Sequence, residues 1–384
     1  MSKDDKKKPE LKLDFKNLPE LKSTTYNLPK PPPVSLGKKK DEEALQDLKD
    51  RKPFSLRDQY DLNTYQGRFR HQFSRINPLL FFVSEPTILE CKEKVEKHRL
   101  REEASRQINA PVLLKEKEIE ELVYADKVVG SSLHPDTGKI IPFYQRMSGF
   151  VIFNVPLVFA VLFTKNQTPA FNATFQGINQ TYNASMNYGN RNATSPYTIA
   201  DMGKGYFAAT AVSVLIALYT RKAFASTLKP LSGYSLTFAN SSLNYLAGAL
   251  AGASNLALMR YREMQEGIKV YSKEGDEEYG SSKVAAKKAI GQTAFSRFLL
   301  PLPVLFFPAF AQLLFTKLRI WPRNTYATKF LELSFCAIAL TVALPMSVAL
   351  FQQRGMITRD EVDEDIREAT KDKNVQEFYF NKGL

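Results

Sequence analysis

Apolar residues are distributed unevenly along the 384-residue chain. After residue 147, five segments are almost free of charged residues: 148–164, 205–220, 231–259, 293–315 and 331–351. The first of them is close to the shortest helix that crosses a hydrocarbon core about 30 Å thick. Five such segments exceed what a soluble core needs. The pattern therefore predicts an all-α, polytopic helical membrane protein with about five transmembrane helices.

The chain before these segments is highly charged. Residues 1–53 are rich in Lys, Asp, Glu and Pro and lack apolar periodicity, so we expect an extension that is disordered unless a partner protein binds it. Residues 54–147 have the spacing of charged amphipathic helices outside the membrane. A transmembrane bundle over 148–351 and a C-terminal tail over 352–384 complete the expected organisation. The N-terminus has no secretory or transit-peptide pattern, so any organelle import would use internal signals.

The composition excludes several kinds of site. The chain has 53 Lys and Arg against 40 Asp and Glu, a net charge of +13 and a mean hydropathy of −0.29, values that average a charged front and an almost neutral bundle. Cys91 and Cys336 are far apart and the three histidines are scattered, so no disulfide framework, metal site or cofactor is predicted.

No nucleophile, acid–base pair or phosphate-binding loop stands out, and we expect no enzymatic activity. The basic extension has few aromatic residues that could stack on bases. Its expected partners are therefore membrane lipid or a docked protein, and not nucleic acid.

The most informative segment is a polar helix predicted over 171–191. At about 100° per residue, its amides share one face: Asn172, Gln176, Asn179, Asn183, Asn187 and Asn190, with Gln180 and Arg191 at the margin. Such a row is costly in lipid without hydrogen-bond partners. Three interpretations remain open: a glycosylated lumenal loop, a helix on the membrane surface, or a helix lining a polar cavity. Neutral amides suit a zwitterionic or uncharged polar ligand better than an ion.

A second set of amides lies in segment 231–259. Asn240, Asn244 and Asn255 fall within about 60° of one another on a helical wheel, beside a Gly-x-x-x-Gly motif. Small residues let two helices approach closely, so these amides either join helices or extend the polar site. Prolines interrupt the apolar segments as packing kinks or as breaks used in substrate binding or gating.

Four separated motifs resemble, in order, those of the sideroflexin family. Asp61-Leu-Asn-Thr64-Tyr-Gln-Gly67-Arg68-Phe-Arg-His71 resembles its N-terminal motif, with Leu62 and Asn63 where the family has Gln and Ser. His134-Pro135-Asp136-Thr137-Gly138 is similar to its segment before the first span, and we expect a turn there instead of a metal site. The Asn179–Arg191 row resembles its Asn-rich signature, and 379–384 its C-terminus. The resemblance covers about residues 54–384.

The resemblance implies a multi-pass mitochondrial inner-membrane protein that transports small neutral amino acids, serine above all, for one-carbon metabolism. The predicted substrate site combines the 171–191 helix with the amides of 240–255, and Arg191 would donate to the substrate carboxylate. The alternative is an accessory subunit of a large inner-membrane complex that retains the fold. It is suggested by Gly252 and Ala257, which stand where the family has an Asn and a Pro.

Overall fold

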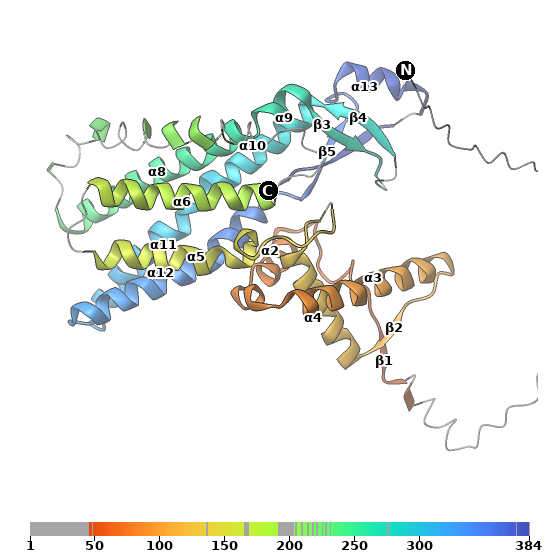
Figure 1. Ribbon diagram of the computed structural model, residues 1–384, viewed down its shortest axis with the longest axis horizontal. Helices are drawn as coiled ribbons and strands as arrows, with labels where there is room; N and C mark the ends of the chain where they lie inside the picture. The colour runs from red at the N-terminus through yellow and green to blue at the C-terminus, as the bar shows by residue number, and fades with distance from the viewer. Residues whose placement is uncertain are drawn as a thin grey trace, which may run out of the picture. The chain divides into compact units, whose positions relative to one another are not determined.

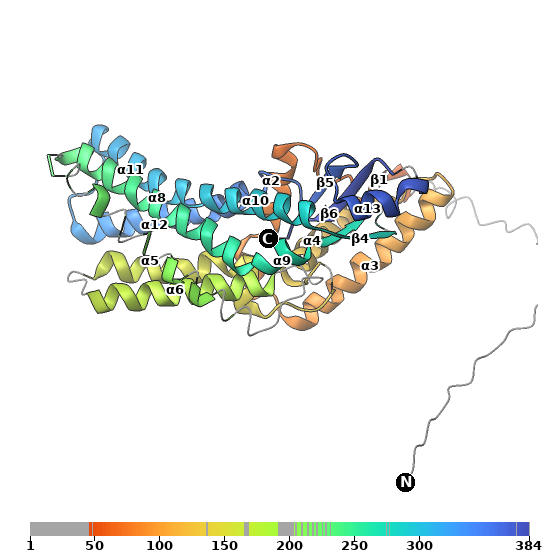
Figure 2. The ribbon, with the colours of Figure 1, turned by 90° about the horizontal axis from the view of Figure 1, so that it is seen from above.

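The computed structural model describes residues 46–47, 49–135, 137–164, 169–190, 232–273, 275, 277–373 and 375–383, with scattered positions between 203 and 230. The chain divides into two units, Met1–Asp50 and Arg51–Leu384. All elements discussed below belong to the second unit, and Figures 1 and 2 show their arrangement.

Helices form most of the region before the apolar segments. They are α2 (Tyr65–Arg75), η2 (Pro78–Phe82), α3 (Glu85–Gln107), α4 (Glu116–Ser132), η3 (Phe143–Gln145) and η4 (Met147–Gly149). Ser84 caps α3 by accepting a hydrogen bond from the Thr87 N–H. The helices α3 and α4 pack on each other around a core that includes Ile88, Val95 and Val128. Two short strands accompany these helices: β1 (Arg51–Pro53) pairs with β2 (Leu113–Lys115).

Seven helices follow in the described part of the chain, and all of them except the six-residue α9 are long and run side by side (Figures 1 and 2). They are α5 (Phe150–Phe163), α6 (Pro169–Gly189), α8 (Gly233–Met259), α9 (Tyr261–Glu266), α10 (Lys283–Leu299), α11 (Pro301–Lys317) and α12 (Thr325–Val348). The helix α12 packs on α5 and α11, and α8 packs on α10 and α11. Phe150 of α5 and Leu340 and Leu344 of α12 share a buried cluster.

The expectation of about five transmembrane helices is met only in part. Among the described residues, two helical segments are long and apolar enough to cross a membrane: Lys283–Lys317, which joins α10 and α11, and Thr325–Val348. The apolar stretch Met147–Ala160 is shorter. Most of the predicted segment 205–220 lies outside the described residues. Segment 231–259 forms α8, whose amides lower its hydropathy.

The C-terminal part contains a sheet, so the all-α expectation is met only in part: the chain is mostly helical but includes small sheets. The strands β3 (Ile268–Tyr271), β4 (Glu278–Ser282), β5 (Arg354–Thr358) and β6 (Glu377–Asn381) form one antiparallel sheet in the order β4-β3-β6-β5. With α13 (Glu364–Ala369), η5 (Lys371–Lys373) and the start of α10 they enclose a core that includes Val270, Ile357, Phe378 and Phe380. Residues 352–384 thus complete a small α/β layer, because every second residue of β5 and β6 faces this core.

Candidate functional site

The predicted polar helix is present as α6, Pro169–Gly189. Its described amides are partly buried, and their hydrogen bonds differ along the helix. Asn183 donates to the Asn179 side chain at 3.3 Å. Asn190, just past the last helical residue, donates to the Gln145 carbonyl at 2.8 Å and to the Met186 carbonyl at 2.8 Å. The C-terminal end of the amide row is therefore hydrogen-bonded within the protein.

Asn187 receives the most informative of these hydrogen bonds. Its side-chain oxygen accepts from the Arg297 guanidinium on α10 at 2.7 Å. The two residues are 110 positions apart in the sequence. A charged donor gives a stronger hydrogen bond than a neutral one, so this contact fixes Arg297 between α6 and α10.

A cavity of about 30 Å³ lies beside this contact. Its polar lining consists of Asn190, Thr293, Ser296, Arg297, Ser347 and Lys382. Its apolar lining includes Met147, Met186, Leu344 and Val348. The site is thus built by α6, α10, α12 and the residues after β6, which come from distant parts of the sequence.

The hydroxyl groups of this cavity are oriented by their own helices. Thr293 donates to the Ala289 carbonyl at 2.8 Å, and Ser347 donates to the Leu344 carbonyl at 3.0 Å. Each hydroxyl hydrogen is therefore used within its helix, while the oxygen keeps lone pairs that can accept. The cavity therefore offers a ligand two kinds of group: the cationic side chains of Arg297 and Lys382, and neutral hydroxyl oxygens that accept hydrogen bonds.

Lys382 is the second cation of the cavity and is 2% exposed. Its ammonium group donates to the Phe351 carbonyl at 3.4 Å and lies 5.7 Å from the centre of the Phe351 ring. Burial, followed by repulsion from Arg68 and Arg260, lowers the pKa of Lys382 to about 8. Within the described chain, neither Lys382 nor Arg297 forms an ion pair with a carboxylate.

Sequence reasoning missed both cations as site residues. Arg297 is a charged residue within an apolar segment, which is a pattern that marks functional positions in membrane proteins. Lys382 belongs to the C-terminal motif, and only the fold brings it to the cavity.

Other predicted site residues lie elsewhere or are not described. Arg191 and Asp136 fall outside the described residues, as do the side chains of Gln180, Asn240 and Asn244. Asn255 is buried on α8, and it does not line the cavity. The close approach of α8 to α10 is seen at Gly252, where a Cβ would lie 3.7 Å from the Arg297 carbonyl oxygen.

The N-terminal motif forms a clamp on the end of α12. Thr64 caps α2 by accepting from the Gly67 N–H at 3.1 Å, and its hydroxyl donates to the Asp61 carbonyl at 3.0 Å. Arg68 donates to the Ala349 carbonyl at 2.8 Å. That carbonyl belongs to the C-cap of α12, and the last carbonyl groups of a helix have no N–H partner within the helix. The motif therefore anchors the region before the apolar helices to a membrane-length helix.

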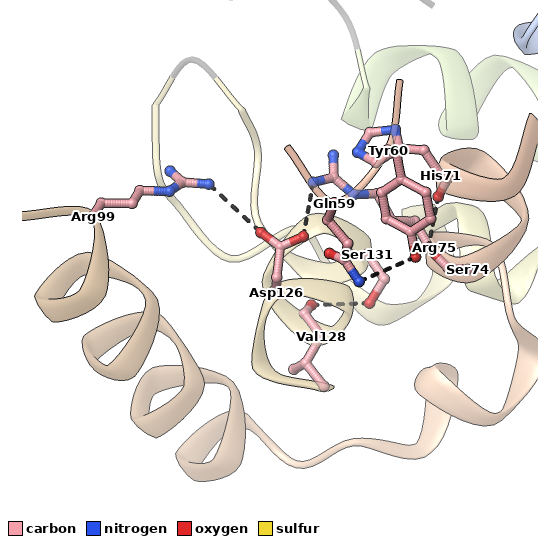
Figure 3. A network of polar contacts seen from close by, with 9 residues as sticks. All are labelled: Gln59, Tyr60, His71, Ser74, Arg75, Arg99, Asp126, Val128 and Ser131. Atoms are coloured by element: carbon pink, nitrogen blue, oxygen red, sulfur yellow. Dashed lines mark hydrogen bonds and ion pairs between the residues drawn. The ribbon is translucent and has the colours of Figure 1, made fainter. Parts of the chain in front are cut away.

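His71 belongs to a polar network within the helices that precede the apolar segments. Figure 3 shows Asp126 between Arg75, at 3.3 Å, and Arg99, at 3.7 Å. The His71 ring meets the Tyr60 ring edge-on, with 5.4 Å between their centres. Burial, followed by the charge of Arg75, lowers the pKa of His71 to about 4, and the charge of Asp126 opposes this. His71 is therefore neutral at physiological pH.

The lowered pKa of His71 predicts that the folded protein loses stability in acid. Between pH 6.5 and about 4 the unfolded chain binds a proton that folded His71 does not, so stability falls as the pH is lowered through this range. We expect His71→Gln to flatten this part of the profile of Tm against pH, measured for the protein in detergent. A profile as steep as that of the wild type would assign the acid sensitivity to other groups.

The described residues of the second motif form the expected turn. The Gly138 N–H donates to the His134 carbonyl at 2.9 Å, and the Lys139 N–H donates to the Thr137 hydroxyl at 3.4 Å. Gly138 has φ +61°, which favours glycine, and Pro135 lies within the turn. In the part of the chain that the structure describes, no group of three His, Cys, Asp or Glu residues could hold a metal ion.

Comparisons with known proteins agree with the motifs and with the membrane-length helices. The family profile described as Sideroflexins matches residues 56–384. The chain belongs to the sideroflexin family. Human Sideroflexin-5 is 32% identical over 341 residues, covering 87% of this chain and 94% of the relative.

Other sideroflexins match over a similar range. Bovine Sideroflexin-3 is 31% identical over 327 residues, covering 85% of this chain and 96% of the relative. The Sideroflexin of Dictyostelium discoideum is 30% identical over 338 residues, covering 85% and 95%. No solved structure gives a significant match. Family membership and the two membrane-length helices together indicate that this sideroflexin is a membrane protein.

Proposed function

We propose that this sideroflexin transports a small neutral amino acid, with serine as the first candidate, across the mitochondrial inner membrane and thereby supports one-carbon metabolism. The observation that carries the proposal is the cavity between α6, α10 and α12. It combines two cations with hydroxyl acceptors and an amide, which matches the carboxylate, ammonium and hydroxyl groups of a polar zwitterion. In this proposal Arg297 takes the carboxylate-binding role that sequence analysis gave to Arg191.

The size of the cavity implies a conformational change during transport. A cavity of about 30 Å³ has room for about two or three water molecules. A free amino acid is several times larger, so the helices must separate to admit it. Pro345 interrupts α12 beside the cavity-lining residues Leu344 and Ser347. Such a break allows a helix to bend during alternating access.

Uptake of labelled serine by proteoliposomes that contain only this protein tests the proposal. Saturable uptake above that of protein-free liposomes is expected, with competition by other small neutral amino acids. No uptake, combined with stable co-purification in an inner-membrane complex, would contradict the proposal. It would favour the second candidate, an accessory subunit, which is supported by the Gly252 and Ala257 replacements and by the basic N-terminal extension.

The pKa of Lys382 gives a second prediction. We expect serine uptake to fall as the pH rises through about 8, because Lys382 loses the charge that attracts the substrate carboxylate. Lys382→Arg should move this decline to higher pH, since arginine stays charged.

The stability of the folded protein should rise with pH while serine uptake falls, so a loss of transport can be distinguished from unfolding. Between pH about 8 and 10.5 the unfolded chain holds a proton on Lys382 that the folded chain has lost, so Lys382 contributes stability that increases with pH. A decline in uptake that follows a decline in Tm would contradict the prediction.

A further inference from the structure

One face of α2 carries apolar side chains that the described part of the chain leaves exposed or only half-buried. Tyr65, Phe69 and Phe73 are spaced four residues apart along the helix, and Leu62 lies in the turn just before it. The rings of Tyr65 and Phe69 stack at 6.4 Å, and those of Phe69 and Phe73 at 5.7 Å. Leu62, Tyr65 and Phe73 are each exposed by more than 40%. We call these four residues the aromatic stripe.

The stripe is continuous with the surface of a membrane-length helix. The Tyr65 hydroxyl donates to the Met346 carbonyl of α12 at 3.4 Å. The Met346 side chain is itself exposed, and α12 ends two residues later at Val348. Figures 1 and 2 show α2 at this end of α12. The stripe therefore lies where α12 leaves the membrane.

The neighbouring segment η2 packs on α5 at the same end of the helical bundle. Phe81 packs edge-on against Phe153 of α5, with ring centres 5.8 Å apart, and edge-on against Phe82 at 5.1 Å. Phe82 is 73% exposed. Because the start of α5 and the end of α12 share a buried cluster, both contacts lie at one end of the helical bundle.

The charge of α2 suits a lipid surface. Its sequence contains three arginines and no acidic residue, and Arg70 is exposed. Aromatic rings are enriched at membrane–water interfaces, and basic residues beside them attract anionic headgroups. We propose that the aromatic stripe and Phe82 are inserted into the headgroup region of the leaflet from which α12 emerges, so that α2 lies on the membrane as an interfacial helix.

Tryptophan quenching tests this placement. The single tryptophan is first removed as Trp321→Phe, and Phe73→Trp or Phe82→Trp is then introduced into the full chain in proteoliposomes. Both new tryptophans should lose emission when the phosphatidylcholine carries bromine on its acyl chains, and they should be protected from aqueous iodide. Leu100→Trp is the matched control. Leu100 is 67% exposed on α3, which packs on α4, so its emission should resist brominated lipid and be quenched by iodide.

Two results would overturn the proposal. The first is iodide quenching at positions 73 and 82 as strong as at position 100, with no effect of brominated lipid, which would place the stripe in water. The second is protection from both quenchers that increases with the ratio of protein to lipid, which would indicate a protein occupant. Each introduced tryptophan replaces an exposed apolar side chain, and Trp321→Phe replaces one aromatic residue by another, so all variants should fold, and unchanged Tm values check this.

Discussion

Replacing Arg297 by glutamine is expected to lower serine uptake about tenfold or more. Arg297 is the cation of the cavity that lies within a membrane-length segment, and the Asn187 oxygen holds it at 2.7 Å. A hydrogen bond to a charged group contributes about 1.5–3 kcal/mol, which corresponds to roughly 10–100-fold in binding. Glutamine can still donate to Asn187 but cannot neutralise a carboxylate. Initial uptake rates in proteoliposomes, normalised to inserted protein, measure the loss.

A matched control lies on the same helix. Lys287 of α10 is exposed, so Lys287→Gln removes one positive charge from α10 without touching the cavity. This variant should keep wild-type uptake. Arg297→Lys should retain part of the activity, because the charge remains while the planar fork is lost. Equal uptake by Arg297→Gln and Lys287→Gln would exclude Arg297 from the transport site.

Replacing Gly67 by alanine is expected to destabilise the protein by about 3 kcal/mol. A Cβ at this position would lie 1.9 Å from the Asp61 carbonyl oxygen, and that atom belongs to the backbone of the same motif. Relief of the clash would move Asp61 and the Thr64 cap, and with them the Arg68 contact to α12. A fall in Tm of several degrees should be seen in thermal unfolding of the detergent-solubilised protein.

Gly291 provides the control for this substitution. It lies on α10, and nothing within 4 Å would meet a Cβ there. Alanine is a better helix former than glycine, so Gly291→Ala should leave Tm unchanged or raise it, by up to about 1 kcal/mol in stability. If Gly67→Ala unfolds at the wild-type temperature, the close approach to Asp61 is not a constraint on the fold.

Local patterns predicted the helices well where spacing is periodic over many residues. The amide row predicted a helix over 171–191, and α6 occupies Pro169–Gly189. The apolar runs 231–259 and 331–351 correspond to α8 and α12. Periodicity succeeds here because backbone hydrogen bonds within a helix join residues four apart, so the pattern and the structure share one length scale.

The sheet was missed because its strands are short and pair across long distances. Gly355, Ile357, Phe378 and Phe380 show the alternation of half-buried strands, but five-residue segments in a charged region resemble a solvated tail. The strand β3 pairs with β6 and precedes it by more than a hundred residues. Pairing of that kind depends on how the intervening helices, among them α10 and α12, pack. The local spacing of residues carries no information about this packing.

The sequence by itself determined that this chain is a sideroflexin with a charged front, a polar α6 and apolar helices, because composition, helical period and short motifs are local properties. The tertiary structure decided which polar groups meet. Asn187 contacts Arg297, Lys382 reaches the same cavity, and Arg68 binds the end of α12. These contacts join residues about thirty to nearly three hundred positions apart, so only the packing of helices into one bundle brings them together.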